Sequence, residues 1–113
     1  MNVFKIIFLL PVLLCSCVQA GEQDVLKQYF FFRCVNEGHS ELDFEKFDGS
    51  LGYTTDLISS DFSVVKAVSD YAKKVGKSVP VSNHNDKKSV LLICLNAYER
   101  SELDALIKSE IGD

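Results

Sequence analysis

Methionine and histidine are scarce in this sequence of 113 residues. Met1 is the only methionine, which excludes the clusters of thioether ligands that are typical of copper carriers. The two histidines, His39 and His84, lie far apart in polar segments, without cysteine or acidic neighbours at the spacing of metal ligands. We therefore expect both histidines to be surface residues, and we expect no metal site.

The residue patterns of common catalytic sites are missing as well. The segment Asp48–Gly52 lacks the lysine and the preceding strand that a phosphate-binding loop needs. Ser, His and Asp occur together within Ser82–Asp86, but catalytic triads are assembled by the fold rather than by adjacency. No CxxC motif accompanies Cys34 or Cys94. We predict that the protein is not an enzyme and uses no cofactor.

Positive charge is also in short supply. The chain has 12 lysines and arginines against 16 acidic residues, which gives a formal net charge of −4. Binding to nucleic acid requires a clustered positive surface, so this balance argues against a nucleic-acid partner. The acidity is accounted for by solubility, although the acidic run from Glu41 to Asp48 would also steer a basic partner.

The first twenty residues have the pattern of a secretory signal peptide. Lys5 ends a short basic region, the apolar run Ile6–Leu14 follows, and small residues lead to Ala20. The apolar run is too short to cross a membrane. We therefore predict a signal peptide at residues 1–20, cleaved after Ala20, and one folded domain at residues 21–113.

A competing interpretation concerns Leu14–Cys17, which resembles the lipobox of bacterial lipoproteins with Cys17 as the lipidated residue. Lipidation would anchor the domain to a membrane through Cys17, and without it we expect no membrane partner. Both interpretations place the domain outside the reducing cytosol.

Only two cysteines, Cys34 and Cys94, remain beyond the signal peptide. In an exported chain an even number of cysteines favours a disulfide. This one would close a long loop and would stabilise the domain by roughly 4 kcal/mol. The alternative is a pair of buried free thiols.

The segment Asp24–Asn36 has the pattern of a helix that is apolar on nearly all sides. One stripe recurs every four residues: Leu26, Phe30 and Cys34. Such a helix lies either at the centre of its fold or against a second subunit. A second set of apolar residues on other sides of the helix forms a possible dimer face: Phe31, Phe32 and Val35.

The next segment allows two interpretations. Glu37–Ser40 breaks the first helix, and the residues at 41–47 alternate as a strand would. Acidic residues and the later Gly49 and Gly52 weaken the strand, so we expect a helix over Phe44–Leu57.

Two helices have clearer signals. Ser60 or Asp61 is suited to cap a helix whose apolar stripe covers 64–75, and Gly76 stands where a helix usually stops. Ser101–Asp104 is close to a capping box and predicts a final helix.

The apolar run within Ser89–Tyr98 fits either a buried strand or a buried helix. No candidate strand has a partner strand, so an all-helical fold needs fewer assumptions. We predict the all-α class, as a small single-domain bundle of four to five helices.

The longest polar interruption, Val79–Asp86, precedes the segment that contains Cys94. Polar loops held by a rigid helical frame are frequent binding elements, and the alternative is a mobile connector. The candidate binding residues are Val81, Ser82, Asn83, His84, Asn85 and Asp86.

Three stretches carry a family resemblance: Tyr29–Val35 near the start of the domain, Gly52–Tyr53 in its middle and Cys94–Leu106 at its end. Together they resemble the type VI secretion amidase immunity proteins, over essentially the whole of residues 21–113. The third stretch is the most specific, because an aliphatic segment with a cysteine leads there into a polar helix start.

This resemblance implies a periplasmic, all-helical protein that binds and blocks a peptidoglycan amidase delivered by neighbouring bacteria. Members of the family are similar in forming homodimers, and a protruding loop between helices enters the groove of the enzyme. Val79–Asp86 corresponds to that loop by location alone, whereas the cysteine pair matches better. A second hypothesis, from another class, is a small envelope lipoprotein with a structural or assembly role.

Overall fold

The computed structural model describes residues 21–112, which form five helices and two short 3-10 turns. The helices are the first helix, of which residues 21–38 are described, α2 (Ser50–Leu57), α3 (Phe62–Lys77), α4 (Val90–Glu99) and α5 (Ser101–Ile111). The 3-10 turns cover Ser40–Leu42 and Phe44–Lys46. The described residues contain no β-strand, so the predicted all-α class and the four to five helices are confirmed.

The predicted signal peptide, its cleavage after Ala20 and the alternative of lipidation at Cys17 concern residues 1–20, which lie outside the described residues. Within residues 21–112, no helix combines the length and the hydrophobicity that crossing a lipid bilayer requires.

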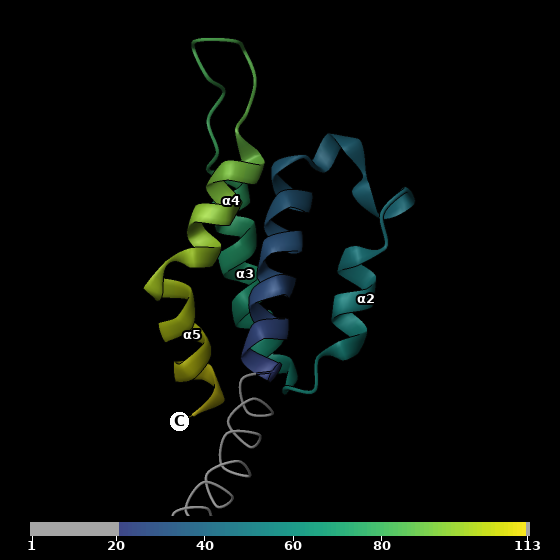
Figure 1. Cartoon of the computed structure of the whole chain (residues 1–113), viewed down its shortest axis with the longest axis vertical. Helices are drawn as coiled ribbons and strands as arrows, with labels where there is room; N and C mark the ends of the chain where they lie inside the picture. Colours follow the sequence, from purple (N-terminus) through teal and green to yellow (C-terminus); the bar gives the residue numbers. More distant parts are fainter. Residues whose placement is uncertain (1–20, 113) are drawn as a thin grey trace, which may run out of the picture.

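The first helix lies at the centre of the fold. Figure 1 shows α3, α4 and α5 grouped on one side of it and α2 on the other side. This central position follows from the apolar residues on several faces of the helix, because each face can be buried against a different neighbour. The first helix is therefore central to the fold, which is one of the two arrangements that its apolar pattern allows.

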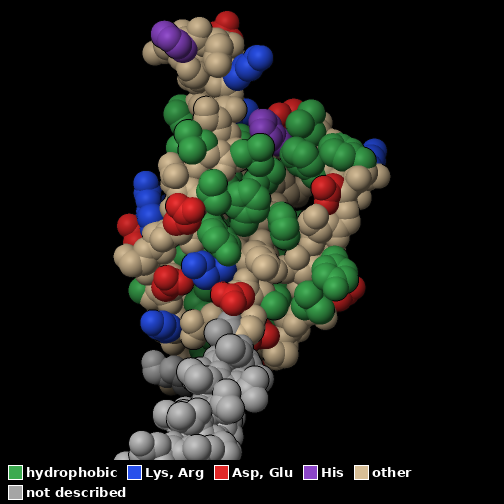
Figure 2. All heavy atoms as spheres, viewed as in Figure 1, with side chains coloured by type: hydrophobic (Ala, Val, Ile, Leu, Met, Phe, Trp, Pro, Cys, Tyr) green, Lys and Arg blue, Asp and Glu red, His purple; other side chains and the backbone are tan. Residues whose placement is uncertain are grey.

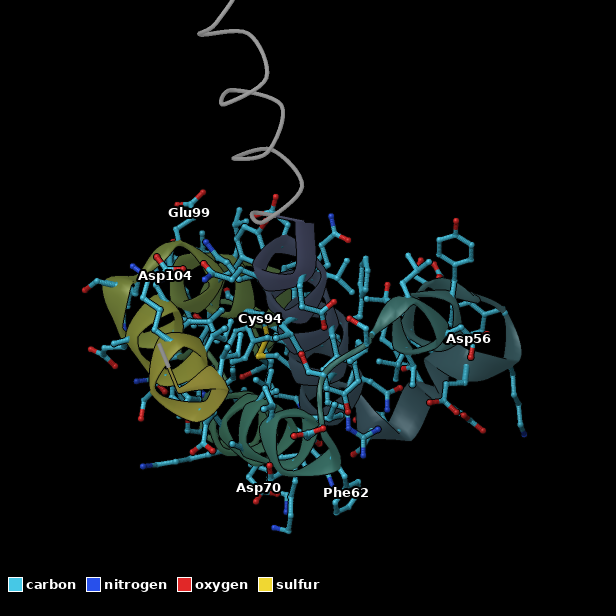
Figure 3. The ribbon with its side chains drawn as sticks, turned by 90° about the horizontal axis from the view of Figure 1, so that it is seen from below. Asp56, Phe62, Asp70, Cys94, Glu99 and Asp104 are labelled. Carbon is cyan, nitrogen blue, oxygen red and sulfur yellow. A yellow bond between two sulfur atoms is a disulfide. The ribbon has the colours of Figure 1, made fainter. Side chains whose placement is uncertain are left out.

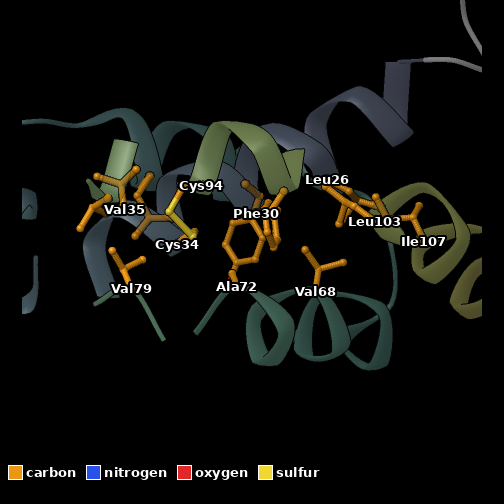
Figure 4. Close-up of a cluster of buried hydrophobic side chains, with 14 of the residues drawn as sticks. Leu26, Phe30, Cys34, Val35, Val68, Ala72, Val79, Cys94, Leu103 and Ile107 are labelled. Atoms are coloured by element: carbon orange, nitrogen blue, oxygen red, sulfur yellow. A yellow bond between two sulfur atoms is a disulfide. The ribbon is translucent and has the colours of Figure 1, made fainter. Parts of the chain in front are cut away.

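The core forms along the stripe that the sequence predicts. Leu26, Phe30 and Cys34 are fully buried, and they face apolar residues of the helices around them (Figure 4). These partners are Val68 and Ala72 of α3, Cys94 of α4, and Leu103 and Ile107 of α5. One helical face thus holds three helices together.

A disulfide joins Cys34 and Cys94 and so links the first helix to α4. The two Cα atoms are 5.9 Å apart and both side chains are fully buried. This finding confirms the predicted pair and excludes the alternative of two free thiols. In a domain of this size, a cross-link that closes such a long loop contributes roughly 4 kcal/mol to stability on the chain-entropy model.

Two glycines let helices approach closely. A Cβ atom on Gly76 of α3 would lie 2.5 Å from the carbonyl oxygen of Cys34, and one on Gly38 would lie 2.6 Å from Val90 Cγ1. The prediction that α3 stops at Gly76 is wrong by one residue, because the helix continues to Lys77. Gly76 is present because the backbone of the first helix leaves no room for a side chain.

The helix expected over Phe44–Leu57 is only partly correct, since α2 begins at Ser50. Asp43 has a left-handed backbone with φ 50°, and the Asp48 carboxylate accepts a hydrogen bond of 2.8 Å from the Ser50 amide. These two aspartates interrupt the helix, because each favours a local turn over the helical hydrogen-bond ladder. The alternative of a strand over 41–47 is wrong as well.

The final helix is confirmed, but its capping box is not. Arg100 occupies the N-cap of α5 without a side-chain cap, and Ser101 is the first helical residue. The acidic residues of the first turn serve tertiary contacts instead. Glu102 accepts a hydrogen bond from the Tyr71 hydroxyl at 3.2 Å, and Asp104 lies 3.4 Å from the Lys27 ammonium.

Glu22 ties the first helix to the segment between α2 and α3. Its carboxylate accepts hydrogen bonds from the hydroxyls of Ser59 and Ser60, at 2.9 and 2.7 Å, and from their backbone amides. Asp61, one of the two residues suited to the cap, is the N-cap residue of α3, but its side chain makes no cap hydrogen bond. Partial burial raises the pKa of Glu22, but the hydrogen bonds from Ser60 and Ser59 outweigh that effect, so its pKa lies below the ordinary value.

Candidate binding surfaces

The predicted loop between α3 and α4 projects from the end of the bundle (Figure 1). We call residues 78–89 the hairpin, because Val81 and Lys88 form an antiparallel bridge at its base. The Ser82 amide donates to the Lys87 carbonyl at 2.9 Å, and the Asp86 amide donates to the Ser82 carbonyl at 3.1 Å. The projecting segment therefore has a defined backbone shape.

Side chains also fix the tip of the hairpin. The His84 amide donates to Ser82 Oγ at 3.1 Å, and the Lys87 amide donates to Asn85 Oδ1 at 3.1 Å. Asp86 adopts φ 58°, a left-handed conformation that aspartate tolerates better than most residues. Val81, Asn83, His84, Asn85 and Asp86 are exposed, and Ser82 is half-buried. Figure 2 shows histidine, lysine and acidic side chains together at this end of the molecule.

The root of the hairpin is attached to the end of the first helix. Lys88 Nζ donates a hydrogen bond of 2.8 Å to the Gly38 carbonyl and lies 3.9 Å from the Glu41 carboxylate. Val79 is buried, and Val90 packs against Gly38. Cys94 of the disulfide lies one helical turn after Val90 on α4. The hairpin is therefore attached to the part of the fold that the cross-link constrains.

A second candidate surface is an apolar face formed by the first helix and α4. Phe31 and Phe32 are half-buried, and their rings pack edge to face with the ring centroids 5.7 Å apart. The ring of Phe31 also packs edge to face against that of Tyr98, with the centroids 6.3 Å apart. Leu91 and Leu95, one turn apart on α4, are 60% and 43% exposed. Hydrophobic side chains gather accordingly at the centre of the face in Figure 2.

Two apolar hollows flank the phenylalanine pair. A hollow of 200 Å³ lies between the first helix, Leu91 and Phe44, and one of 230 Å³ lies beside Leu95 and Tyr98. Phe31 and Phe32 line both hollows. The face is thus a ridge of two rings with a recess on either side.

The structure divides the three residues predicted as a dimer face. Phe31 and Phe32 lie in this apolar face, whereas Val35 is only 8% exposed and contributes to the wall of one hollow. The sequence pattern does not single out Leu91, Leu95 or Tyr98, because an apolar run of this kind is typical of a buried segment. In a helix, however, their spacing of four and three residues places these three side chains on one side.

The described residues offer no further polar centre around the histidines. His39 lies 3.4 Å from Glu41, and His84 belongs to the exposed tip of the hairpin. Among residues 21–112, no group of three or more His, Cys, Asp or Glu side chains is arranged to hold a metal ion.

The fold and these surfaces define a small, disulfide-linked helical protein that presents a projecting hairpin and an apolar face. No family model matches the chain, and neither a curated protein nor a solved structure matches it.

Proposed function

We propose that this protein is a periplasmic immunity protein, which binds a peptidoglycan amidase of type VI secretion and occludes its active-site groove. The observation that carries the proposal is the hairpin, a polar segment that projects from the end of the bundle with its own hydrogen bonds. It lies between α3 and α4, and by location alone it corresponds to the protruding interhelical loop of the family that the sequence resembles.

Blocking a groove requires shape, satisfied polar groups and exclusion of substrate, and it requires no catalytic residue in the inhibitor. The exposed tip offers amide, imidazole and carboxylate groups from Asn83, His84, Asn85 and Asp86. An enzyme that cleaves peptide stems exposes polar groups along its groove, and these side chains supply both donors and acceptors for them.

The rigid root supports the same role. A free peptide loses much conformational entropy when it docks, whereas a segment already folded back on itself loses less. The bridge between Val81 and Lys88, the bond from Lys88 to Gly38 and the nearby disulfide all restrict the hairpin before binding. Pre-organisation of this kind favours a tight complex.

The second part of the proposal is a homodimer formed through the apolar face. Phe31 and Phe32 form a ridge between two hollows, so in a two-fold arrangement each ridge faces a recess of the partner. Leu91 and Leu95 would lose their exposure to water at such an interface.

Replacing Ser82–Asp86 with five glycines tests the role of the hairpin. We expect unchanged helicity and a similar melting temperature, because this segment contributes no core residue. The inhibition constant for the amidase should rise at least tenfold, about 1.4 kcal/mol, since the glycine segment loses its side-chain contacts and its pre-formed shape.

The matched control for this experiment is Lys74→Ala, a change of an exposed residue on α3. It should inhibit the amidase as well as the wild type does. An unchanged inhibition constant for the glycine variant would reject the hairpin as the main contact.

A further inference from the structure

Helix α4 packs against the bundle with its smaller side chains. Its fully buried residues are Val90, Cys94 and Ala97, whereas three of its leucines are exposed: Leu91, Leu92 and Leu95. A leucine side chain buries more apolar area than an alanine or a cysteine does. Burial of the side chains of α4 therefore does not by itself determine which face of this helix turns inward.

The large core residues join three other helices. They are Leu26 and Phe30 of the first helix, Val68 of α3, and Leu103 and Ile107 of α5. Figure 4 shows Leu26 and Leu103 at one end of the core and the disulfide at the other end. The first helix, α3 and α5 thus share large buried side chains at the end of the core that lies away from the disulfide.

The disulfide lies at the middle of the buried face of α4. Val90 and Ala97 lie one helical turn to either side of Cys94. The bond from Cys94 to Cys34 fixes this face against the first helix. The cross-link therefore determines the rotation of α4 about its own axis and keeps the three leucines on the outside.

The two ends of α4 allow it to move together with the hairpin. At the hairpin end, Lys88 donates one hydrogen bond of 2.8 Å to the Gly38 carbonyl, and water can replace such a partly buried bond. At the other end, Arg100 alone separates α4 from α5, and its backbone is extended. Hinges are often residues at the ends of elements. Without the disulfide, rotation at Arg100 would carry α4 and the hairpin away from the first helix.

The two sulfur atoms are closed off in the folded protein. Cys34 and Cys94 have no exposed surface, and Figure 3 shows the disulfide inside the bundle. A dithiol reduces a disulfide by thiolate attack on one sulfur, which forms a mixed disulfide, and its second thiol then releases the protein. Two electrons and two protons pass to the protein, which gains two thiols, while the dithiol becomes a disulfide. Because the attack requires contact with a sulfur atom, α4 must open before this reaction.

We propose that the Cys34–Cys94 disulfide is a redox latch that holds α4 and the hairpin on the bundle. In the reduced protein α4 and the hairpin detach as one unit, while the first helix, α3 and α5 stay packed. Only the oxidised protein presents the hairpin and the leucines of α4 in fixed positions, and disulfides persist in oxidising compartments. The latch is a property of the free protein and does not depend on the proposed inhibition of an amidase.

Hydrogen exchange tests the latch, followed by nuclear magnetic resonance of the isotope-labelled protein with dithiothreitol as the reductant. After reduction the backbone amides of residues 79–99 should exchange at least about tenfold faster, because this unit opens more often. The amides of α3, of α5 and of the first helix up to Phe30 should change by less than about threefold. Reoxidation should restore the original pattern.

The double variant Cys34→Ala, Cys94→Ala is the matched control. It should show the exchange pattern of the reduced protein, and dithiothreitol should not change that pattern. The latch is overturned if reduction leaves residues 79–99 protected, if protection falls equally in all helices, or if the double variant keeps the pattern of the oxidised protein.

Discussion

Gly76 shows how a single residue sets the distance between two helices. The missing side chain lets α3 lie against the Cys34 carbonyl, next to the disulfide and below the root of the hairpin. The sequence predicts the apolar core residues at single-residue level, because Leu26, Phe30 and Cys34 follow helical spacing. It does not predict the reason for Gly76, because the Cys34 carbonyl that excludes a side chain comes from a segment far away in sequence.

Gly76→Ala should destabilise the protein by about 1–3 kcal/mol, because the new methyl group meets backbone that cannot move independently. Chemical denaturation measures this change in the free energy of unfolding. Gly52→Ala is the matched control: Gly52 lies within α2 and has open space around it, so this change should be neutral or should stabilise by up to about 1 kcal/mol. Equal effects of the two substitutions would contradict the close approach.

At the scale of elements, periodic segments are predictable and interrupted ones are not. The first helix, α3 and α5 follow apolar stripes of period 3.6, and all three appear where the pattern places them. The helix predicted over Phe44–Leu57 does not form at residues 44–49, because the local turns of Asp43 and Asp48 override a weak helical pattern. The sequence does not decide whether α4 is a helix or a strand, because an apolar run fits both equally.

Glu22 connects two elements and makes their contact depend on pH. Its folded-state pKa is lowered, so its contribution to stability is present above the unfolded pKa and is lost as the pH falls through the folded pKa. Glu22→Gln should therefore destabilise the protein near neutral pH, and the difference from the wild type should shrink in acid. Denaturation at about pH 7 and about pH 3 measures both differences.

Glu99→Gln is the control for this pH dependence, since Glu99 is exposed at the end of α4 (Figure 3). It should unfold like the wild type at both pH values. A Glu22→Gln variant whose difference from the wild type is the same at both pH values would contradict the role of the ionised carboxylate.

At the scale of the whole molecule, the two candidate surfaces differ in how far the sequence predicts them. The position of the hairpin follows from a polar interruption between two apolar segments. The apolar face is assembled from the first helix and α4, which the fold brings together through the Cys34–Cys94 disulfide. Phe31 and Phe32 could be named from the sequence, but Leu91 and Leu95 could not, because their exposure depends on what α4 packs against.

The dimer is tested by placing a charge on the apolar face. Leu95→Glu should keep the fold, because the side chain is already 43% exposed, but it should shift the protein to monomers in light-scattering measurements. Phe62→Glu is the matched control, since Phe62 is 79% exposed at the start of α3, outside the apolar face (Figure 3). Identical masses for the wild type and Leu95→Glu would contradict the dimer face.

The most direct test of the proposed function is a titration of the oxidised protein, residues 21–113, into a purified type VI peptidoglycan amidase. Peptidoglycan digestion is followed as the readout. Activity should fall in proportion to the added protein and disappear at stoichiometric amounts. Full activity in the presence of excess folded, oxidised protein would contradict the proposed function.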